Sequence, residues 1–218
     1  MTDPSRASVR IEQPAHPADV RAVGYGPDDV PQVPARYAGM PVHKETSGRA
    51  DVWNPRLMDP QPSAVYVVDE RYVYVTDPVG RVEHAEGWLG WLSAEENVER
   101  RNLEAQLEAG EPDRQASDDG GHLFATKFDG PGESVNLTAQ SRTQNRAVKD
   151  SSNWRRMEES WQALRAAGIQ VHAAIDVTHP NLRTRRPSKR TVVSRSDGKP
   201  SPRRIFRETS PQPSRGYE

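Results

Sequence analysis

The sequence predicts an α+β fold in which strands come first, a helical unit follows, and further strands complete the chain. β-Branched and aromatic residues gather in short runs within residues 64–85 and 169–207, and the clearest helical periodicity lies between them, in residues 152–167. Only 33% of the residues are hydrophobic, 28% are charged, and the nineteen prolines are unevenly placed. This composition favours one modest core with disordered ends over two compact domains.

The first strands are predicted by two runs rich in valine and tyrosine. Residues 64–68 and 72–76 are separated by a short polar turn, which is typical of a β-hairpin. Residues 81–85 are expected to add a third strand. Residues 94–109 then favour a helix that stops at Gly110.

The main helix is expected at residues 152–167, capped by Ser151 or Ser152 and closed by Gly168. Its apolar residues recur at three- and four-residue spacing and form one stripe: Trp154, Met157, Trp161 and Leu164. We expect these side chains to belong to the core. The remaining strands are predicted at residues 169–177, 190–194 and 205–207.

The two ends of the chain are predicted to lie outside the folded domain. Residues 1–36 are polar and rich in proline, and we expect a disordered tail or linker there; residues 208–218 give the same prediction. The domain is therefore expected at residues 37–207. No apolar run approaches the roughly 20 residues that a membrane helix needs, so no membrane association is expected. No hydrophobic segment follows the first residues, so we expect synthesis in the cytoplasm and, if export occurs, a specialised secretion system.

Charge and cysteine content limit the chemistry. The chain has no cysteine, which excludes disulfides and thiolate metal sites, so any metal must be held by oxygen or imidazole. The formal net charge is only -1. Residues 183–207, however, are strongly basic, and two interpretations stay open: a sheet edge that faces phosphates, or a basic and partly disordered tail.

The residues that can carry chemistry lie in 118–146. Taken singly they are weak signals, because Asp-Gly-Gly is an ordinary turn sequence and asparagine is common in loops. Together they suit phosphodiester hydrolysis, which needs a base, a cation on the phosphate and a proton for the leaving oxygen. The imidazole of His122 can act as the base, and an asparagine oxygen such as that of Asn145 can anchor magnesium, which keeps several waters. We expect Gly120 and Gly121 to let the backbone turn sharply and a phosphate approach closely.

An ordered set of motifs resembles a known family: Asp119-Gly120-Gly121-His122, Asn136-Leu137-Thr138-Ala139-Gln140, Asn145-Arg146 and Trp154-Arg155-Arg156-Met157-Glu158. The chain is similar to the DNA/RNA non-specific endonucleases of the ββα-metal (His-Me finger) type, in particular to the bacterial branch found as toxin domains. The resemblance covers about residues 64–207 and implies a small antiparallel sheet with one main helix. It also implies cleavage of DNA and RNA with little sequence preference.

The resemblance assigns roles residue by residue. His122, in the motif that starts at Asp119, corresponds to the general base, and Asn145 to the ligand of Mg²⁺, for which Mn²⁺ can substitute. Asn136 and Gln140 match polar residues that shape the site, and Glu158 matches a helix carboxylate near the hydrated metal. The products would carry 5′-phosphate and 3′-hydroxyl ends. The family also uses an arginine to stabilise the transition state, and four candidates remain: Arg71, Arg81, Arg142 and Arg146.

Two departures from the family pattern stand out. Gly120 replaces an arginine that is often found in the signature, and the chain between Asn145 and Trp154 is longer than in the shortest members, which leaves the position of Glu158 open. His172 and Asp176 share one strand face without other ligands, so we expect them to be surface residues.

Two alternative functions remain open. The chain can be a non-catalytic nucleic-acid-binding module that uses residues 183–207, or a scaffold in which the fold only mediates contacts. An active non-specific nuclease would harm the cell that makes it. The expected partners are therefore DNA and RNA substrates and an immunity or inhibitor protein.

Overall fold

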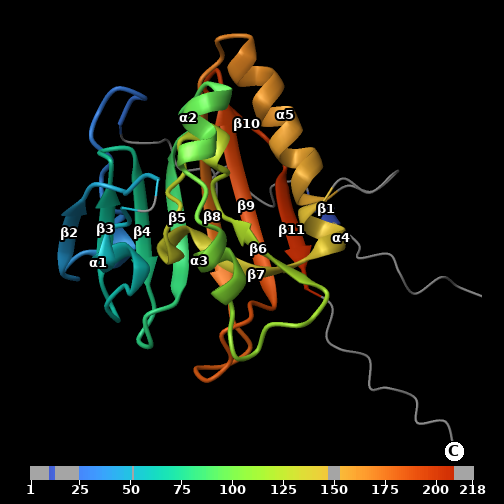
Figure 1. The fold of residues 1–218 in the computed structure, drawn as a ribbon. Helices are drawn as coiled ribbons and strands as arrows, with labels where there is room; N and C mark the ends of the chain where they lie inside the picture. The colour runs from blue at the N-terminus through green and yellow to red at the C-terminus, as the bar shows by residue number, and fades with distance from the viewer. Residues whose placement is uncertain (1–9, 13–24, 51, 147–152, 209–218) are drawn as a thin grey trace, which may run out of the picture.

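The computed structural model describes residues 10–12, 25–50, 52–146 and 153–208, and within them it shows the α+β fold (Figure 1). A nine-stranded main sheet has the order β1-β11-β9-β8-β5-β4-β3-β2, with β10 paired to β9. Its strands are β1 (Arg10–Glu12), β2 (Val42–Glu45), β3 (Val65–Val68), β4 (Tyr72–Thr76), β5 (Val82–Trp88), β8 (Val171–Thr178), β9 (Lys189–Ser196), β10 (Lys199–Pro200) and β11 (Arg203–Arg207). All pairs are antiparallel except β2 with β3.

The remaining elements are short, apart from one helix. They are η2 (Ala35–Tyr37), α1 (Pro55–Met58), α2 (Ala94–Glu99), α3 (Leu103–Glu108), η3 (Thr126–Phe128), η4 (Ser134–Asn136), α4 (Arg142–Asn145) and the long α5 (Trp154–Ala166). A second, two-stranded sheet pairs β6 (Asp118–His122) with β7 (Leu137–Ser141). None of the described helices is both long and apolar enough to cross a membrane.

The predicted hairpin is confirmed as β3 and β4. Its turn places Asp69 and Glu70 at φ 53° and 51°, a left-handed conformation that suits a tight hairpin. The predicted third strand is β5, which pairs with β4 and continues further than expected, to Trp88.

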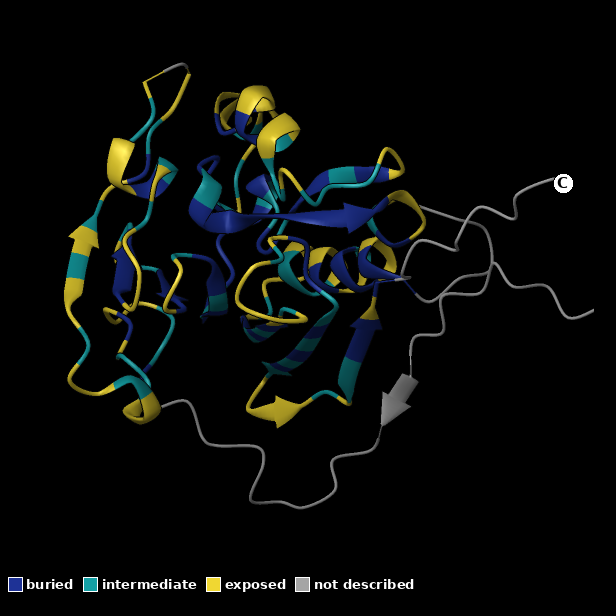
Figure 2. Ribbon diagram, turned by 90° about the horizontal axis from the view of Figure 1, so that it is seen from below, coloured by how far each residue is buried: buried dark blue, intermediate teal, exposed yellow. Residues whose placement is uncertain are grey.

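Helix α5 covers one face of the main sheet and closes the larger core. Trp154, Met157 and Trp161 are almost fully buried, as predicted, and Trp154 packs edge-on to Phe206 of β11. Asn153 caps the helix by accepting a hydrogen bond from the Arg156 backbone, whereas Ser151 and Ser152 lie outside the described residues. Figure 2 shows buried residues along most strands, and exposed residues on the outer turns of the helices and on strands β2 and β10.

Residues before β2 cover the opposite face of the sheet. Val33, Tyr37 and Met40 pack against a second cluster of four valines from β3 and β4. Tyr25 is buried there, and its backbone carbonyl accepts a hydrogen bond from Trp88. Part of the stretch expected to be a tail therefore packs on the sheet; residues 1–9 and 13–24 lie outside the described residues.

The same face holds a polar cluster that the sequence does not reveal. His84 lies between two carboxylates, with Nδ1 2.8 Å from Asp176 and Nε2 3.1 Å from Glu86. His172 is buried and bonds the hydroxyl of Tyr25 at 3.1 Å. The expectation that His172 is a surface residue is wrong, because it is buried. Asp176 is half exposed, as expected of a surface residue, but it has partners in His84 and Arg36.

The segment 94–109 forms two short helices instead of one. Helix α2 ends at Glu99, and Asn102 caps α3 by accepting a hydrogen bond from the backbone of Ala105. A buried ion-pair network causes the break: Arg100 points inward and pairs with Asp69 and Asp129. This break leaves Arg101 exposed between the two helices.

Candidate active site

The candidate residues gather on the unit β6-β7-α4. In the antiparallel register Asp119 lies opposite Gln140, and His122 lies opposite Leu137 at the other end of the pair. Helix α4 follows β7 directly and ends at Asn145. This pair of strands was not among the predicted strands, and it brings the Asp119–His122 and Asn136–Gln140 motifs together with Asn145.

Asp119 is the centre of a compact polar cluster. Its carboxylate accepts two hydrogen bonds from Arg146, at 2.7 and 2.8 Å, and one from Arg142 at 3.3 Å. It also accepts a hydrogen bond from Asn145 Nδ2 at 3.1 Å. Burial alone would raise the pKa of Asp119, but the hydrogen bonds and charge of Arg146, with the bond from Asn145, lower it. Asp119 is therefore a carboxylate that orients its neighbours.

The bond to Asp119 fixes the orientation of the Asn145 amide. A carboxylate accepts hydrogen bonds, so the NH₂ group of the amide must face Asp119. Oδ1 then points away, and no described residue donates a hydrogen bond to it. The arrangement resembles the outer hydrogen bonds that hold metal ligands in place.

His122 combines burial with the lack of a partner. Although the residue as a whole is partly exposed, its Nε2 atom is buried and has no hydrogen-bond partner among the described residues. Burial, with a smaller contribution from the charge of Arg101, lowers the pKa of His122 to about 4. The imidazole is therefore neutral at pH 7 and able to accept a proton.

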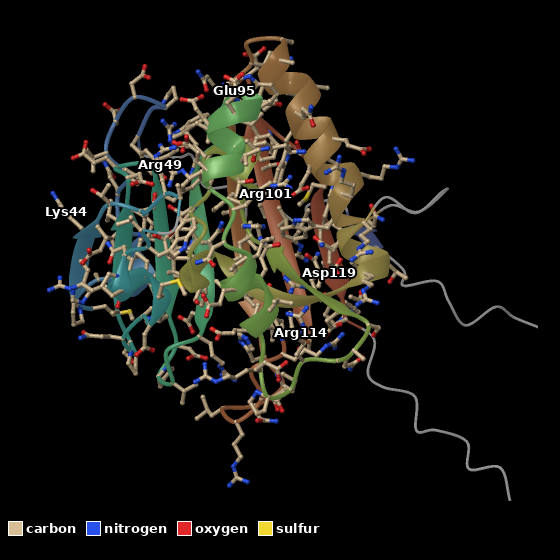
Figure 3. The ribbon with its side chains drawn as sticks, in the orientation of Figure 1. Lys44, Arg49, Glu95, Arg101, Arg114 and Asp119 are labelled. Carbon is tan, nitrogen blue, oxygen red and sulfur yellow. The ribbon has the colours of Figure 1, made fainter. Side chains whose placement is uncertain are left out.

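Arg101 is a functional candidate that the sequence analysis missed. It is exposed, and within the described part of the chain its side chain makes no hydrogen bond or ion pair. Figure 3 shows it at the middle of the face that also carries Asp119. The sequence offered only a weak signal for Arg101, namely two adjacent arginines, Arg100 and Arg101, inside an acid-rich segment.

The interpretation of Gly120 and Gly121 as a sharp turn is wrong. Both lie within strand β6, and neither is among the glycines with positive φ. A Cβ on Gly120 would overlap the backbone carbonyl of Gln106 in α3, and one on Gly121 would overlap the side chain of Gln140. The glycines permit close packing, which also explains why an arginine cannot occupy position 120 in this chain.

Asn136 organises the loop that follows His122. Its side chain is fully buried and makes four hydrogen bonds, of 2.8 to 3.0 Å, with Tyr74, Pro131 and the backbone of Phe124. All donor and acceptor positions of the amide are thus used inside the protein. This geometry supports a positioning role for Asn136.

Gln140 and Glu158 occupy different surroundings. Gln140 is buried on the strand opposite Asp119, and its Nε2 has no partner among the described residues. Glu158 is buried on α5, where burial raises its pKa to about 7 against the opposing charges of Lys127 and Arg155. In the described residues no hydrogen bond or ion pair joins Glu158 to Asn145 or His122.

The arginines divide into structural and accessible groups. Arg81 is buried, pairs with Asp77 at 2.5 Å and donates to the backbone carbonyl of Asn181, so it is not available to a substrate. Arg71 is 3.4 Å from Asp129. Arg142 and Arg146 remain accessible, with 52% and 63% of their side chains exposed.

The basic stretch 183–207 is only partly a surface feature. Arg190 is fully buried and pairs with Glu208, while Arg186 is buried against Asp118. These two arginines join β9 and the preceding loop to β6 and to the buried Glu208, so the expected tail cannot begin at 208. The interpretation of the whole stretch as a phosphate-facing edge is therefore wrong for its two buried arginines.

The site offers one candidate ligand for a metal ion, the Oδ1 atom of Asn145, and the described residues do not form a complete protein coordination shell around it. The described residues contain no group of three or more His, Cys, Asp or Glu side chains able to hold a metal ion. An oriented carboxamide oxygen beside a carboxylate nevertheless fits Mg²⁺, which commonly keeps several waters and takes one or two protein ligands.

Comparison with known proteins identifies a matching family, relatives in sequence and a solved structure with a similar fold. The model of the DNA/RNA non-specific endonuclease family matches residues 62–198. The type VII secretion system protein EssD of Staphylococcus aureus strain USA300 is 37% identical over 106 residues, which are 49% of this chain and 17% of EssD; the match to EssD of strain Newman is similar, at 16% of its length. The chain therefore spans less than a fifth of these relatives. The crystal structure of NucA from Streptococcus agalactiae with magnesium ion bound has 16% identity and a TM-score of 0.51, and the match covers 64% of this chain and 72% of NucA, which shows a shared fold.

Proposed function

The chain belongs to the DNA/RNA non-specific endonuclease family, and from this premise we propose that it is a Mg²⁺-dependent endonuclease of DNA and RNA with His122 as its general base. The observation that carries this proposal is the buried Nε2 of His122, which has no partner among the described residues although its imidazole is neutral. A buried polar atom without a partner is costly. Nε2 of His43 on β2 is also unpartnered, so it is the place of His122, on the strand that carries Asp119 and within reach of the charge of Arg101, that supports its role as the base.

His122 would accept the proton of the attacking water at Nε2. Its lowered pKa means that no resident proton competes at neutral pH. Arg101 is near enough for its charge to lower that pKa, and it is free to contact a phosphate oxygen of the substrate. Because such a contact strengthens as negative charge develops, we propose Arg101 as the transition-state arginine, in addition to the candidates named from the sequence.

Asn145 would hold the metal through Oδ1, with Asp119 keeping the amide in place. When bound, Mg²⁺ or Mn²⁺ supplies positive charge on the phosphate. Arg142 and Arg146 flank this point and are exposed enough to guide a polyanion toward it. Asn136 and Gln140 would position the two strand ends, and Glu158 would support the site from α5.

The test is a gel assay of purified protein on plasmid DNA and total RNA with Mg²⁺ or EDTA. We expect both substrates to be degraded with Mg²⁺ only, and His122→Ala to be inactive. His43→Ala is the matched control, because His43 lies on the distant edge strand β2. Binding without cleavage by the unaltered protein would instead support the nucleic-acid-binding module.

The likeness to EssD, named a type VII secretion system protein, supports a role outside the producing cell. We propose export by such a system and a dedicated immunity protein that blocks the nuclease in its producer. The expected result is that expression of the chain arrests growth, that His122→Ala relieves the arrest, and that a neighbouring gene product which restores growth forms a stable complex with the purified chain. Unimpaired growth with active protein would contradict this role.

A further inference from the structure

A hollow of about 450 Å³ opens beside the candidate metal anchor. One wall is formed by Leu103, Gln106 and Leu107 of α3, and the other wall includes Asp119, Asn145 and Arg146. The hollow is therefore continuous with the polar cluster around Asp119. Figure 3 shows Asp119 beside the labelled Arg114, which also lines the hollow.

The apolar wall is not needed to hold α3 in place. Leu103 and Leu107 are both 69% exposed and belong to neither hydrophobic core. The helix is held instead by buried Ala105, by the backbone contact between Gln106 and Gly120, and by Arg114, which donates to the carbonyl of Leu107 at 2.8 Å. Two leucines in water beside a polar site are thus available to a ligand.

The charges determine which part of a nucleic acid can face each wall. Glu104 and Glu108 are exposed on α3 next to the leucines, and the cation at this wall, Arg114, donates to the α3 carbonyls of Gln106 and Leu107, so the wall is less attractive to phosphates than the side of Arg146. Arg146 and Arg142, on the opposite side, attract them. A strand that passes along the arginines presents its bases toward the leucines.

We propose that this hollow binds an unpaired nucleobase of the substrate strand, next to the phosphate held at Asn145. Apolar side chains stack against base faces, which a single strand offers freely and a duplex offers only after unstacking. The inference rests on the proposed function and adds a preference to it: single-stranded nucleic acid is cleaved faster than duplex.

The test compares three substrates of equal length: a single-stranded oligonucleotide, its duplex, and a fully abasic strand that keeps every phosphate. With the unaltered protein we expect kcat/KM on the single strand to exceed that on either other substrate by about tenfold or more, the scale of one stacking contact. Leu103→Ser with Leu107→Ser should abolish this advantage and leave duplex cleavage unchanged. Leu182→Ser is the matched control, because Leu182 is also exposed, at 61%, and does not line the hollow.

Binding is measured separately, by fluorescence anisotropy of the single and abasic strands with His122→Ala protein, which does not cut them. We expect the base-carrying strand to bind more tightly than the abasic strand, and this difference to be lost when both leucines are also replaced. This result supports the inference even if no cleavage is seen. Failure of the proposed nuclease function can therefore be distinguished from failure of the inference. Equal affinity for the two strands, or an equal loss on duplex and single strand in the leucine variant, would overturn it. Thermal unfolding confirms that the variants are folded, as the exposure of both leucines predicts.

Discussion

Two histidines with buried ring nitrogens lie on opposite faces of the main sheet and have opposite surroundings. His84, behind the main sheet, has a carboxylate at each ring nitrogen, and these hydrogen bonds raise its pKa although burial alone would lower it. His122, on β6, has no partner for its buried Nε2, and its pKa is lowered to about 4. Burial is common to both, so the partners decide what each imidazole can do.

The comparison separates a structural histidine from a chemical one. A proton on His84 is stabilised by Asp176 and Glu86, so His84 is suited to joining strands β5 and β8. His122 lacks such stabilisation of a bound proton, because its buried Nε2 has no partner among the described residues. The unpartnered Nε2 of His122 differs from that of His43 in its place, because His122 lies on β6 with Asp119 and its pKa is lowered in part by Arg101.

The largest effect on activity is expected when each of the two histidines is replaced by alanine in turn. His122→Ala should lower kcat by about 10²- to 10⁴-fold, the usual contribution of a general base. His84→Ala should leave kcat within a few-fold and lower the melting temperature instead. Steady-state kinetics with a fluorogenic oligonucleotide measures both, and equal losses of kcat in the two variants would remove the distinction.

The next effect concerns the cation near His122. Arg101→Ala should lower kcat by about 10²-fold, as for loss of one donor to a transition-state oxygen, and should raise the pKa of His122, because the positive charge of Arg101 lowers it. Titration of the imidazole by NMR measures the pKa. Arg101→Lys, which keeps the charge, should keep the low pKa. An unchanged pKa in the alanine variant would place Arg101 away from the base.

A smaller effect on activity is expected from removing the hydrogen bond that orients Asn145, the proposed metal ligand. Asp119→Ala removes the acceptor that orients Asn145, and should raise the Mg²⁺ concentration for half-maximal activity by about 10- to 100-fold, as for loss of an outer partner of a metal ligand. Asn145→Ala should act in the same direction and more strongly. Magnesium titrations of both variants test this order, which a normal magnesium dependence in Asn145→Ala would refute.

The smallest effect is on stability, and its sign differs between the histidines. The pKa of His122 is lowered in the folded state, so its contribution is complete above about pH 6.5 and is lost as the pH falls from 6.5 to 4. The pKa of His84 is raised, so its contribution is complete below about pH 6.5 and is lost as the pH rises through its folded value. Urea unfolding across pH 4–9 measures the free energy of unfolding that each alanine variant loses relative to the unaltered protein. This loss should grow with rising pH for His122→Ala and shrink with rising pH for His84→Ala. Losses that change with pH in the same direction would contradict the assignment.

Local patterns allowed much of the fold to be predicted. The hairpin β3–β4, the apolar stripe of α5 and the positions of β8, β9 and β11 along the chain each follow from periodicity within a few residues of chain. The break between α2 and α3 did not, because it depends on Arg100 meeting Asp69 and Asp129, which lie about thirty residues away on either side. A helical propensity summed over residues 94–109 contains no such information.

For the site, the sequence indicated the residue types but not their pairing. Asp119 and Asn145 were both named, yet only the structure shows that one orients the other. The basic stretch shows a different error, because two arginines predicted to be accessible are buried in ion pairs. Arg186 pairs with Asp118, and Arg190 pairs with Glu208. Charge counted along the chain cannot distinguish a buried arginine from an exposed one.

The close approach of α3 to Gly120 has a consequence for substitutions in this chain. The backbone carbonyl of Gln106 lies where a Cβ at position 120 would stand. A side chain at this position would therefore have to displace α3, and with it Leu103 and Leu107, which line the hollow beside Asp119. The missing side chain at position 120 thus sets how closely α3 can lie to strand β6.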